Sequence, residues 1–269
     1  MIVRRSGVSP MGVYGPSTYW LLYDAVPNSF GRSSTLRCPL FDLAAGSCRV
    51  WPYREATCAT WFCKYNRGKK GMTFWESLRD LLGALERALA RTLVLELDPG
   101  TESLEVLFSR SGEPFEVEEL VGGASDSSHA RRWGKWGGRE REFFQECAHR
   151  AEAVGLEEVL LMGGVEARAL ALLVRERFQM LQEQGQTDVP LTLGRFEIIR
   201  SMDDHAQLST YSNYDPIEVP RALLAGLVRF DGRPANTVIE EIERCDGVMI
   251  SAELLRTLCD FGVLVESRF

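Results

Sequence analysis

Four of the seven cysteines lie close together near the N-terminus, and this clustering constrains the fold more than any other feature. Cys38, Cys48, Cys58 and Cys63 fall within 26 residues. In a reducing compartment, clustered cysteines bind metal or perform redox chemistry more often than they form disulfides. The first 72 residues show no sustained apolar period. We therefore predict an irregular N-terminal region that is stapled by a metal bound to these four cysteines.

The spacing of the cysteines bears on the identity of the metal. Nine, nine and four residues separate successive members of the cluster. Four thiolates suit either a tetrahedral zinc ion or a [4Fe–4S] cluster. Structural zinc sites usually draw two sulfurs from one short turn, and only Cys58 and Cys63 approach that spacing. Long gaps suit a larger cofactor, so a [4Fe–4S] iron–sulfur cluster is favoured and zinc is the alternative. Burial of the thiols in an aromatic core, without metal, stays open as a third interpretation.

Aromatic and basic residues accompany the cysteines. The aromatic side chains that would keep water and oxygen from a cluster are Phe41, Trp51, Tyr53, Trp61, Phe62 and Tyr65. The basic side chains that would offset the negative charge of four thiolates are Arg49, Arg54, Lys64, Arg67, Lys69 and Lys70. Because a dry surrounding tunes a metal centre, we expect the aromatic residues to enclose the thiols.

Residues 216–269 are the most regular part of the chain. Turn signals divide them into three short helices, at about 220–230, 236–245 and 251–261, and a strand at 263–265. Ser251 is a good N-cap, and Gly262 stands where a helix commonly ends. Three short helices and a terminal strand are the outline of a winged helix-turn-helix. We expect a separable module.

The region between these two parts is mainly helical. The T-x-x-E sequence from Thr73 to Glu76 predicts the start of a helix. Further helices are predicted at about 139–154 and 165–184, strands at 19–23, 104–108 and 191–199, and a loop at 122–138. The predicted fold class is α+β, with a cysteine-cluster metal-binding region at 1–72, a mainly helical core at 73–200 and a winged-helix-like module at 216–269.

Composition and charge exclude some classes of protein. With 45% hydrophobic and 26% charged residues, the chain is globular and not disordered. The formal net charge of −7 disfavours a general nucleic-acid binder. No apolar run approaches the roughly 18 residues of a membrane helix, and the N-terminus lacks the apolar region of a signal peptide. We therefore expect a cytoplasmic protein with no membrane association.

The cysteine segment resembles a known family. Cys38-Pro-Leu-Phe-Asp, then Gly46-Ser-Cys48-Arg-Val-Trp-Pro-Tyr-Arg54, and finally Cys58 are similar to the pattern C-P-F-L … G-x-C-x-I-Y-x-x-R-P-x-x-C of the YkgJ-type cysteine-cluster domain. Glu55 replaces the proline of that pattern. The family is described as zinc- or iron-chelating, and its relatives include flagellin lysine N-methylase. The resemblance implies that these three cysteines bind metal and that the chain modifies a protein or peptide. No cysteine precedes Cys38, so Cys63 is the expected fourth ligand.

The C-terminal segment resembles the PqqD-like winged helices, which bind leader peptides of ribosomally made natural products. The shared pattern is Leu-Leu-x-x-Leu, Asp-Gly, Ile and Leu-Leu-x-x-Leu-x-x-x-Gly-Val-Leu, ending at Leu264. The resemblance implies a protein or peptide partner docked on this module, while a plain helical packing module is the alternative. DNA recognition is disfavoured because the third helix carries Arg256 as its one cation.

The remaining motifs give weaker evidence of a function. Residues 131–139 alternate bases with aromatics and are expected to form a lid-like loop, and Asp203-Asp204-His205 has no partner motif for a metal. Cys147, Cys245 and Cys259 are expected to be structural. No P-loop, dinucleotide or nucleophile-elbow signature is present. Whether the chain is an enzyme stays open. The first hypothesis is a metal protein that modifies or binds a protein or peptide, and the alternative is a non-catalytic interaction protein with a structural zinc site. A transcription regulator is the third hypothesis.

Overall fold

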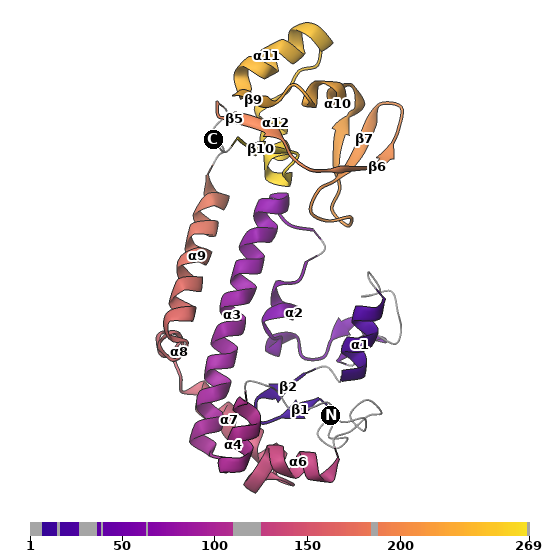
Figure 1. Ribbon diagram of the computed structural model, residues 1–269. Helices are drawn as coiled ribbons and strands as arrows, with labels where there is room; N and C mark the ends of the chain where they lie inside the picture. Colours follow the sequence, from indigo (N-terminus) through magenta and orange to yellow (C-terminus); the bar gives the residue numbers. More distant parts are fainter. Residues whose placement is uncertain are drawn as a thin grey trace. The chain divides into compact units, whose positions relative to one another are not determined.

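The protein is described by a computed structural model that covers residues 7–14, 17–26, 37–38, 40–62, 64–109, 125–183 and 188–267 (Figure 1). The chain divides into two compact units. Residues 1–56 and 82–168 form the first, and residues 57–81 and 169–269 form the second. The predicted segments 1–72, 73–200 and 216–269 run consecutively along the chain, whereas each unit combines two stretches. The segment boundaries stay predictions.

The first unit is mainly helical, with two small hairpins. Its N-terminal stretch contains β1 (Val8–Ser9), β2 (Gly12–Val13), α1 (Ser17–Ala25), β3 (Phe41–Asp42), β4 (Ser47–Cys48) and the 3₁₀ turn η3 (Trp51–Tyr53). Its second stretch contains the second half of α3 (Gly68–Leu97), α4 (Thr101–Phe108), α6 (Asp126–Trp133), η4 (Gly134–Trp136), α7 (Glu140–Glu152), α8 (Leu156–Met162) and the start of α9 (Gly164–Gln182). The helices predicted at 139–154 and 165–184 are confirmed as α7 and α9.

The core of the first unit is aromatic. Trp133, 1% exposed, meets Phe143 edge-on with the ring centroids 5.6 Å apart. The Trp136 indole Nε1 donates to the Leu97 carbonyl at 2.9 Å. The prediction of a loop at 122–138 is therefore wrong for its described part, which contains helix α6. The Ser125 side chain caps the start of α6 by accepting a hydrogen bond from the Ser128 backbone N–H, and the buried Trp133 anchors its end.

Three other local predictions are wrong. Residues 19–23 lie in helix α1, and residues 104–108 lie in helix α4, where Leu104 and Leu107 meet the core at helical spacing. The helix predicted to start at Thr73 starts at Gly68, just after Arg67, which has a φ of +66°. Thr73 Oγ1 donates to the Lys69 carbonyl at 2.9 Å, so this side chain bonds inside the helix and does not cap it.

The second unit contains two three-stranded antiparallel sheets and the C-terminal helices (Figure 1). Besides parts of α2 (Ala56–Thr60), α3 and α9, its elements are β5 (Pro190–Leu193), β6 (Glu197–Ser201), β7 (His205–Ser209), β8 (Ile217–Pro220), α10 (Arg221–Leu227), β9 (Asp231–Pro234), α11 (Ala235–Asp246), α12 (Ala252–Phe261) and β10 (Leu264–Glu266). The three predicted helices and the terminal strand are confirmed. The strand predicted at 191–199 is two strands, β5 and β6, which belong to different sheets.

The C-terminal helices share one apolar core with the strands upstream of them. The fully buried side chains Leu223, Leu227, Ile242 and Leu258 pack in one cluster that also includes Leu191 of β5 and Leu208 of β7. In the sheet of order β10-β5-β9, the middle strand is β5. The core and sheet of the predicted module therefore depend on residues before position 216.

Helix α12 has the ends that its sequence predicts. Ser251 Oγ accepts a hydrogen bond from the Leu254 backbone N–H at 3.1 Å, and Gly262 closes the helix with a φ of +80°. Both predicted end signals are confirmed.

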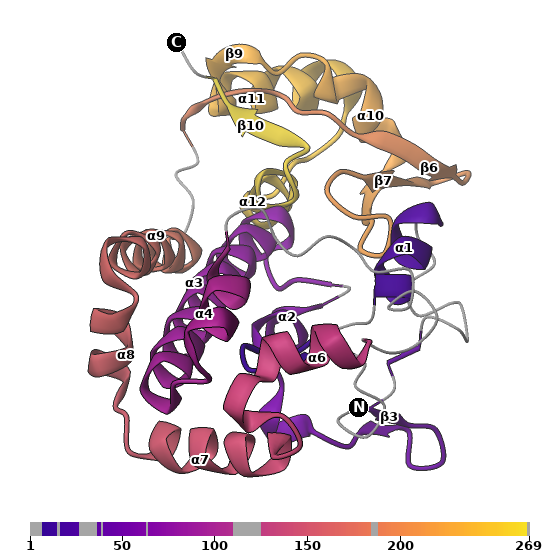
Figure 2. The same cartoon turned by 60° about the horizontal axis from the view of Figure 1, so that its bottom comes forward.

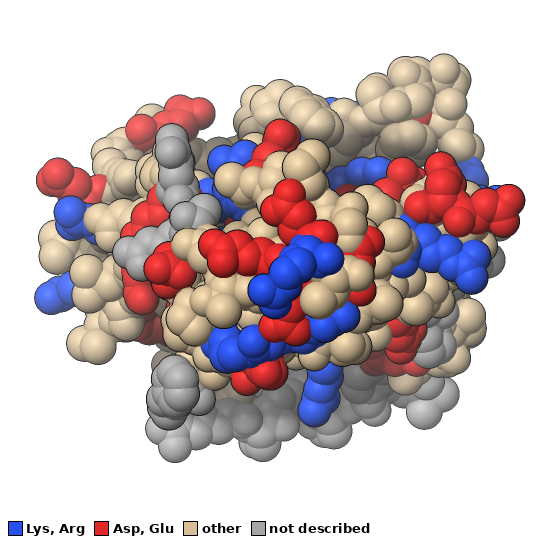
Figure 3. Space-filling model, turned by 90° about the horizontal axis from the view of Figure 1, so that it is seen from above, with Lys and Arg blue, Asp and Glu red and all other residues tan. Residues whose placement is uncertain are grey.

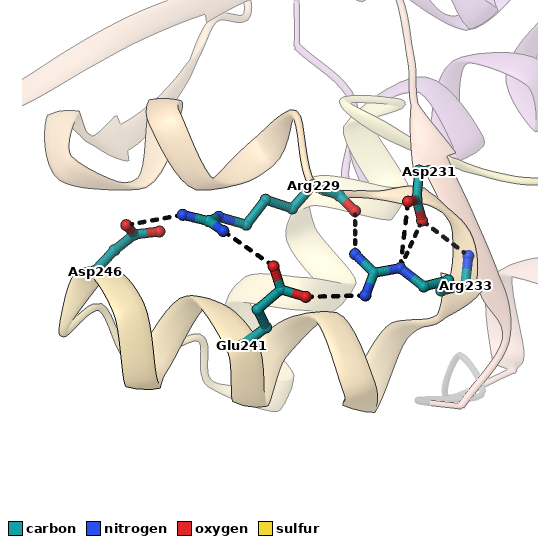
Figure 4. Close-up of polar contacts among 5 residues, drawn as sticks. All are labelled: Arg229, Asp231, Arg233, Glu241 and Asp246. Atoms are coloured by element: carbon teal, nitrogen blue, oxygen red, sulfur yellow. Dashed lines mark hydrogen bonds and ion pairs between the residues drawn. The ribbon is translucent and has the colours of Figure 1, made fainter.

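A charged network joins the turn after α10 to β9 and α11 (Figure 4). Glu241 accepts from Arg229 Nη1 at 3.0 Å and from Arg233 Nη1 at 2.9 Å. Arg229 also pairs with Asp246 at 3.2 Å, and Arg233 pairs with Asp231 at 3.0 Å. The chain as a whole combines helices with small antiparallel sheets, so the predicted α+β class is confirmed.

Candidate functional site

The β3–β4 hairpin of the first unit carries one of the predicted ligands, Cys48, and follows another, Cys38 (Figure 2, where β3 is labelled). Phe41 pairs with Cys48 across the hairpin, and the Phe41 backbone N–H donates to the Cys38 carbonyl at 3.1 Å. Cys38 is exposed and Cys48 is half-buried. Cys48 therefore lies on β4 opposite Phe41, and Cys38 lies three residues before Phe41, outside the paired strands.

The hairpin loop is fixed by Asp42. Its carboxylate accepts from the backbone N–H groups of Ala44 and Ala45 at 3.0 and 3.1 Å and from Arg49 Nε at 3.3 Å. The hydrogen bond from the Ala45 N–H is the largest cause of the lowered pKa of Asp42. Desolvation acts in the opposite direction, and the Ala44 N–H and Arg49 lower the pKa further. Asp42 therefore stays ionised and holds the loop shape at neutral pH.

The other two predicted ligands are not placed with this pair. Cys58 lies on α2 in the second unit and is exposed. Cys63 lies outside the described residues. Among the residues that the structure describes, no three His, Cys, Asp or Glu side chains converge as metal ligands would. The four-cysteine site stays a prediction.

The expected aromatic enclosure of the thiols is wrong for five of the six aromatic residues, and the sixth, Tyr65, is half-buried. Trp51 is 62% exposed and Tyr53 is 86% exposed, and Phe41, Trp61 and Phe62 are exposed as well. A two-residue strand and a 3₁₀ turn are too short to fold these rings inward. Sequence composition showed that aromatic residues were near the cysteines, but it could not show which way the rings face.

Two of the bases expected near the metal have another partner. Arg67 donates to the Asp260 carboxylate from Nε at 2.7 Å and from Nη2 at 2.8 Å, and Lys70 Nζ lies 3.5 Å from Asp260 Oδ1. Asp260 is 4% exposed. These cations compensate a buried carboxylate in the second unit.

A groove of about 820 Å³ lies beside α12 in this unit. Its lining comes from α12, from β10 and from the first turns of α3, with Leu255 and Asp260 buried in it and Glu253, Arg256 and Glu266 exposed along it. Sequence reasoning missed this groove. The available signal was Asp260 itself, an acid directly before Phe261 near the end of a helix that buries Leu255 and Leu258.

The scattered cysteines differ from one another. Burial raises the pKa of both Cys147 and Cys259 to about 11, so these thiols are protonated and unreactive at neutral pH, as expected of structural cysteines. Cys245 is exposed on α11 and does not fit that expectation. His205 Nδ1 lies 2.5 Å from Asp204 Oδ1, and this pair gains no third ligand within the described chain.

The surface in Figure 3 does not show the continuous basic patch that is typical of a nucleic-acid-binding face. Lys and Arg side chains are interspersed with Asp and Glu there and do not gather in one basic patch (Figure 3). This mixture agrees with the net charge of −7.

Comparison with known proteins assigns no family. No family model matches the chain, and no curated protein or solved structure is significantly similar to it. Across the described residues, each helix is too short or too polar to traverse a lipid bilayer.

Proposed function

We propose that this protein binds one metal centre through Cys38, Cys48, Cys58 and Cys63 and uses its C-terminal module to dock a protein or peptide. The observation that supports the metal proposal is the β3–β4 hairpin, because it pairs Cys48 with Phe41, which lies three residues after Cys38. The favoured cofactor is a [4Fe–4S] cluster, which would give the protein redox or group-modification chemistry when bound.

Zinc is the second candidate, and one observation favours it. Cys48 lies on a short hairpin, and structural zinc sites commonly take thiolates from short turns. In that case the protein would be a non-catalytic interaction protein whose N-terminal region is held together by the ion.

The docking proposal rests on the C-terminal elements. Their order α10, β9, α11, α12, β10 supports the proposal of a winged-helix-like module, and β5 joins its sheet from upstream. The groove beside α12 offers apolar floor and charges of both signs, which suit a peptide better than a polyanion. A transcription regulator ranks third.

The experiment is anaerobic purification followed by metal analysis and a visible spectrum. We expect iron and sulfide with a broad absorption near 400 nm, a rough marker of thiolate-bound clusters, that dithionite bleaches. Colourless protein with one equivalent of zinc would establish the second candidate.

Single Cys→Ser variants test the ligand set. Each of Cys38→Ser, Cys48→Ser, Cys58→Ser and Cys63→Ser is expected to lose most of the metal, whereas Cys245→Ser, an exposed cysteine on α11, is expected to keep it. Equal metal content in all five variants, or metal-free wild-type protein, would show that the assignment is wrong.

A further inference from the structure

Strand β6 is an open edge of its sheet in the second unit (Figure 1). The order β6-β7-β8 leaves no described strand on its outer side. All five residues of β6 are exposed, and Ile198 is 53% and Ile199 44% exposed. An exposed edge offers unpaired N–H and C=O groups to other strands, and natural proteins usually shorten, charge or cover it. β6 is the longest of the four edge strands in the two three-stranded sheets of the described chain, so we ask what pairs with it.

A β-bulge makes β6 an uneven partner for most strands. Ile198 pairs with Leu208 of β7 and Arg200 pairs with Gln207, so Ile199 is an extra residue on β6. Two residues of β6 therefore oppose one residue of β7. A regular strand on the outer side would meet the same mismatch, whereas a second β6 carries the same bulge and opposes two residues with two. The bulge thus disfavours unrelated strands and favours a second copy of the chain.

The charges of β6 complement one another across a two-fold axis. Glu197 and Arg200 flank the two isoleucines, both are exposed, and neither has an ion pair or a side-chain hydrogen bond within the described chain. When two copies of β6 run antiparallel about an axis between Ile198 and Ile199, Glu197 of each copy stands opposite Arg200 of the other. Opposite charges directly across an antiparallel pair stabilise it, and like charges destabilise it.

The flanking residues add no repulsion to this register. By the same count, the next charged residues, Arg195, Asp203 and Asp204, all stand opposite uncharged residues of the other copy. The pairing of β6 with itself therefore brings both pairs of opposite charges together and brings no like charges directly face to face.

We propose that two copies of the chain associate through β6, which joins their β6-β7-β8 sheets into one continuous antiparallel sheet. This contact uses the same surface on both copies, so it closes as a dimer and does not extend into a filament. Because β6 pairs over five residues, and stable interfaces bury roughly 1,200–2,000 Å², the dimer should dissociate on dilution. β6 contributes no residue to the groove beside α12, and the proposal requires neither the metal nor a docked peptide.

Sedimentation velocity of the full chain over a wide range of concentrations tests the proposal. We expect the wild type to shift from monomer to dimer as its concentration rises. Glu197→Lys and Arg200→Glu each place two like-charged pairs in the interface and should raise the dissociation constant by about tenfold or more. The double variant Glu197→Lys/Arg200→Glu restores opposite charges and should return the dissociation constant toward that of the wild type.

The matched control is Glu240→Lys, which makes the same charge change at an exposed position on α11 and should leave dimerisation unchanged. Circular dichroism should be the same for all variants, because each substituted side chain is exposed. Weaker association is thereby distinguished from loss of fold.

Three outcomes overturn the proposal. The first is a wild type that stays monomeric at every concentration. The second is a dimer that neither single reversal weakens, because its copies would then meet through another surface. The third is a double variant that associates as weakly as the single variants, because loss without rescue would show that the two charges do not face each other.

Discussion

Arg67 and Asp260, 193 positions apart in the chain, form a bidentate ion pair that is largely shielded from solvent. Their side chains are 19% and 6% exposed. The remaining guanidinium nitrogen, Nη1, donates to the carbonyls of Leu181 and Glu183. One arginine therefore ties the start of α3 to α12 and to the end of α9 within the second unit.

Removing Arg67 should destabilise the protein strongly. Arg67→Ala leaves the buried Asp260 carboxylate with Lys70, 3.5 Å away, as its nearest cation. Breaking a buried pair by removing one partner costs about 3–5 kcal/mol, and we expect a loss near the lower end because Lys70 remains. Urea unfolding followed by circular dichroism measures it.

Two further variants distinguish the effect of the lost Arg67 side chain from the effect of backbone strain at this position and from the loss of an ordinary surface ion pair. Arg67 has a φ of +66°, where residues other than glycine are strained, so Arg67→Gly should be less destabilising than Arg67→Ala by about 1 kcal/mol. Arg79→Ala, which breaks an exposed pair with Asp80, should change stability by less than about 0.5 kcal/mol. Equal losses in the Arg67 and Arg79 variants would contradict the role assigned to Asp260.

Trp133 should be a main anchor of the first unit. Trp133→Ala removes a ring that is 1% exposed and packed on Phe143 and Phe144. A cavity of that kind costs about 3–5 kcal/mol. Trp51→Ala removes an exposed ring and should cost less than about 0.5 kcal/mol. Thermal melts of the two variants test the contrast, and similar melting temperatures would refute it.

Stability should fall in acid because of Glu241. Arg233 and, next, Arg229 lower its pKa from the ordinary value of 4.5. A carboxylate with a lowered folded-state pKa stabilises the protein above its unfolded-state pKa, and this contribution disappears as pH falls through the folded-state value. Wild-type protein should therefore be more stable than Glu241→Gln at pH 7, and the difference should shrink toward pH 3.

The measurement is the urea midpoint of both proteins at several pH values. Glu240→Gln, an exposed neighbour on α11, is the control and should track the wild type throughout. A Glu241→Gln difference that stays constant from pH 7 to pH 3 would show that the network in Figure 4 does not couple stability to protonation.

Truncated fragments should show that the C-terminal helices need the strands before residue 216 in order to fold. A fragment of residues 216–269 lacks β5, the middle strand between β10 and β9, and also lacks Leu208 of the shared core. We expect this fragment to melt without a cooperative transition, whereas residues 188–269 should show one. Cooperative melting of the shorter fragment would mean that the three helices suffice without the sheet.

Local signals predicted the C-terminal helices well because each helix carries its own boundaries. Ser251 and Gly262 mark the ends of α12, and Leu255 and Leu258 face the core at helical spacing. The sheet of β6, β7 and β8 was missed because its strands are four or five residues long, so alternation such as Ala206 and Leu208 facing the core gives little signal.

The cysteine site shows a different limit of sequence reasoning. The pairing of Phe41 with Cys48 is a contact across a hairpin, and no spacing rule distinguishes it from an open loop. The exposure of Trp51 and Tyr53 also depends on how short the surrounding elements are. Residue types predicted which groups matter, but their orientation came only with the folded chain.

The chain passes between its two units three times, and each passage falls inside a helix, α2, α3 or α9. Because each unit is assembled from two separate stretches, no single break in the gene separates one unit from the other. Domain shuffling, which joins complete pieces end to end, therefore offers no simple route to this arrangement or away from it. Lineages that carry this protein should inherit both units together, and its variation should come from insertions in loops and not from exchange of parts.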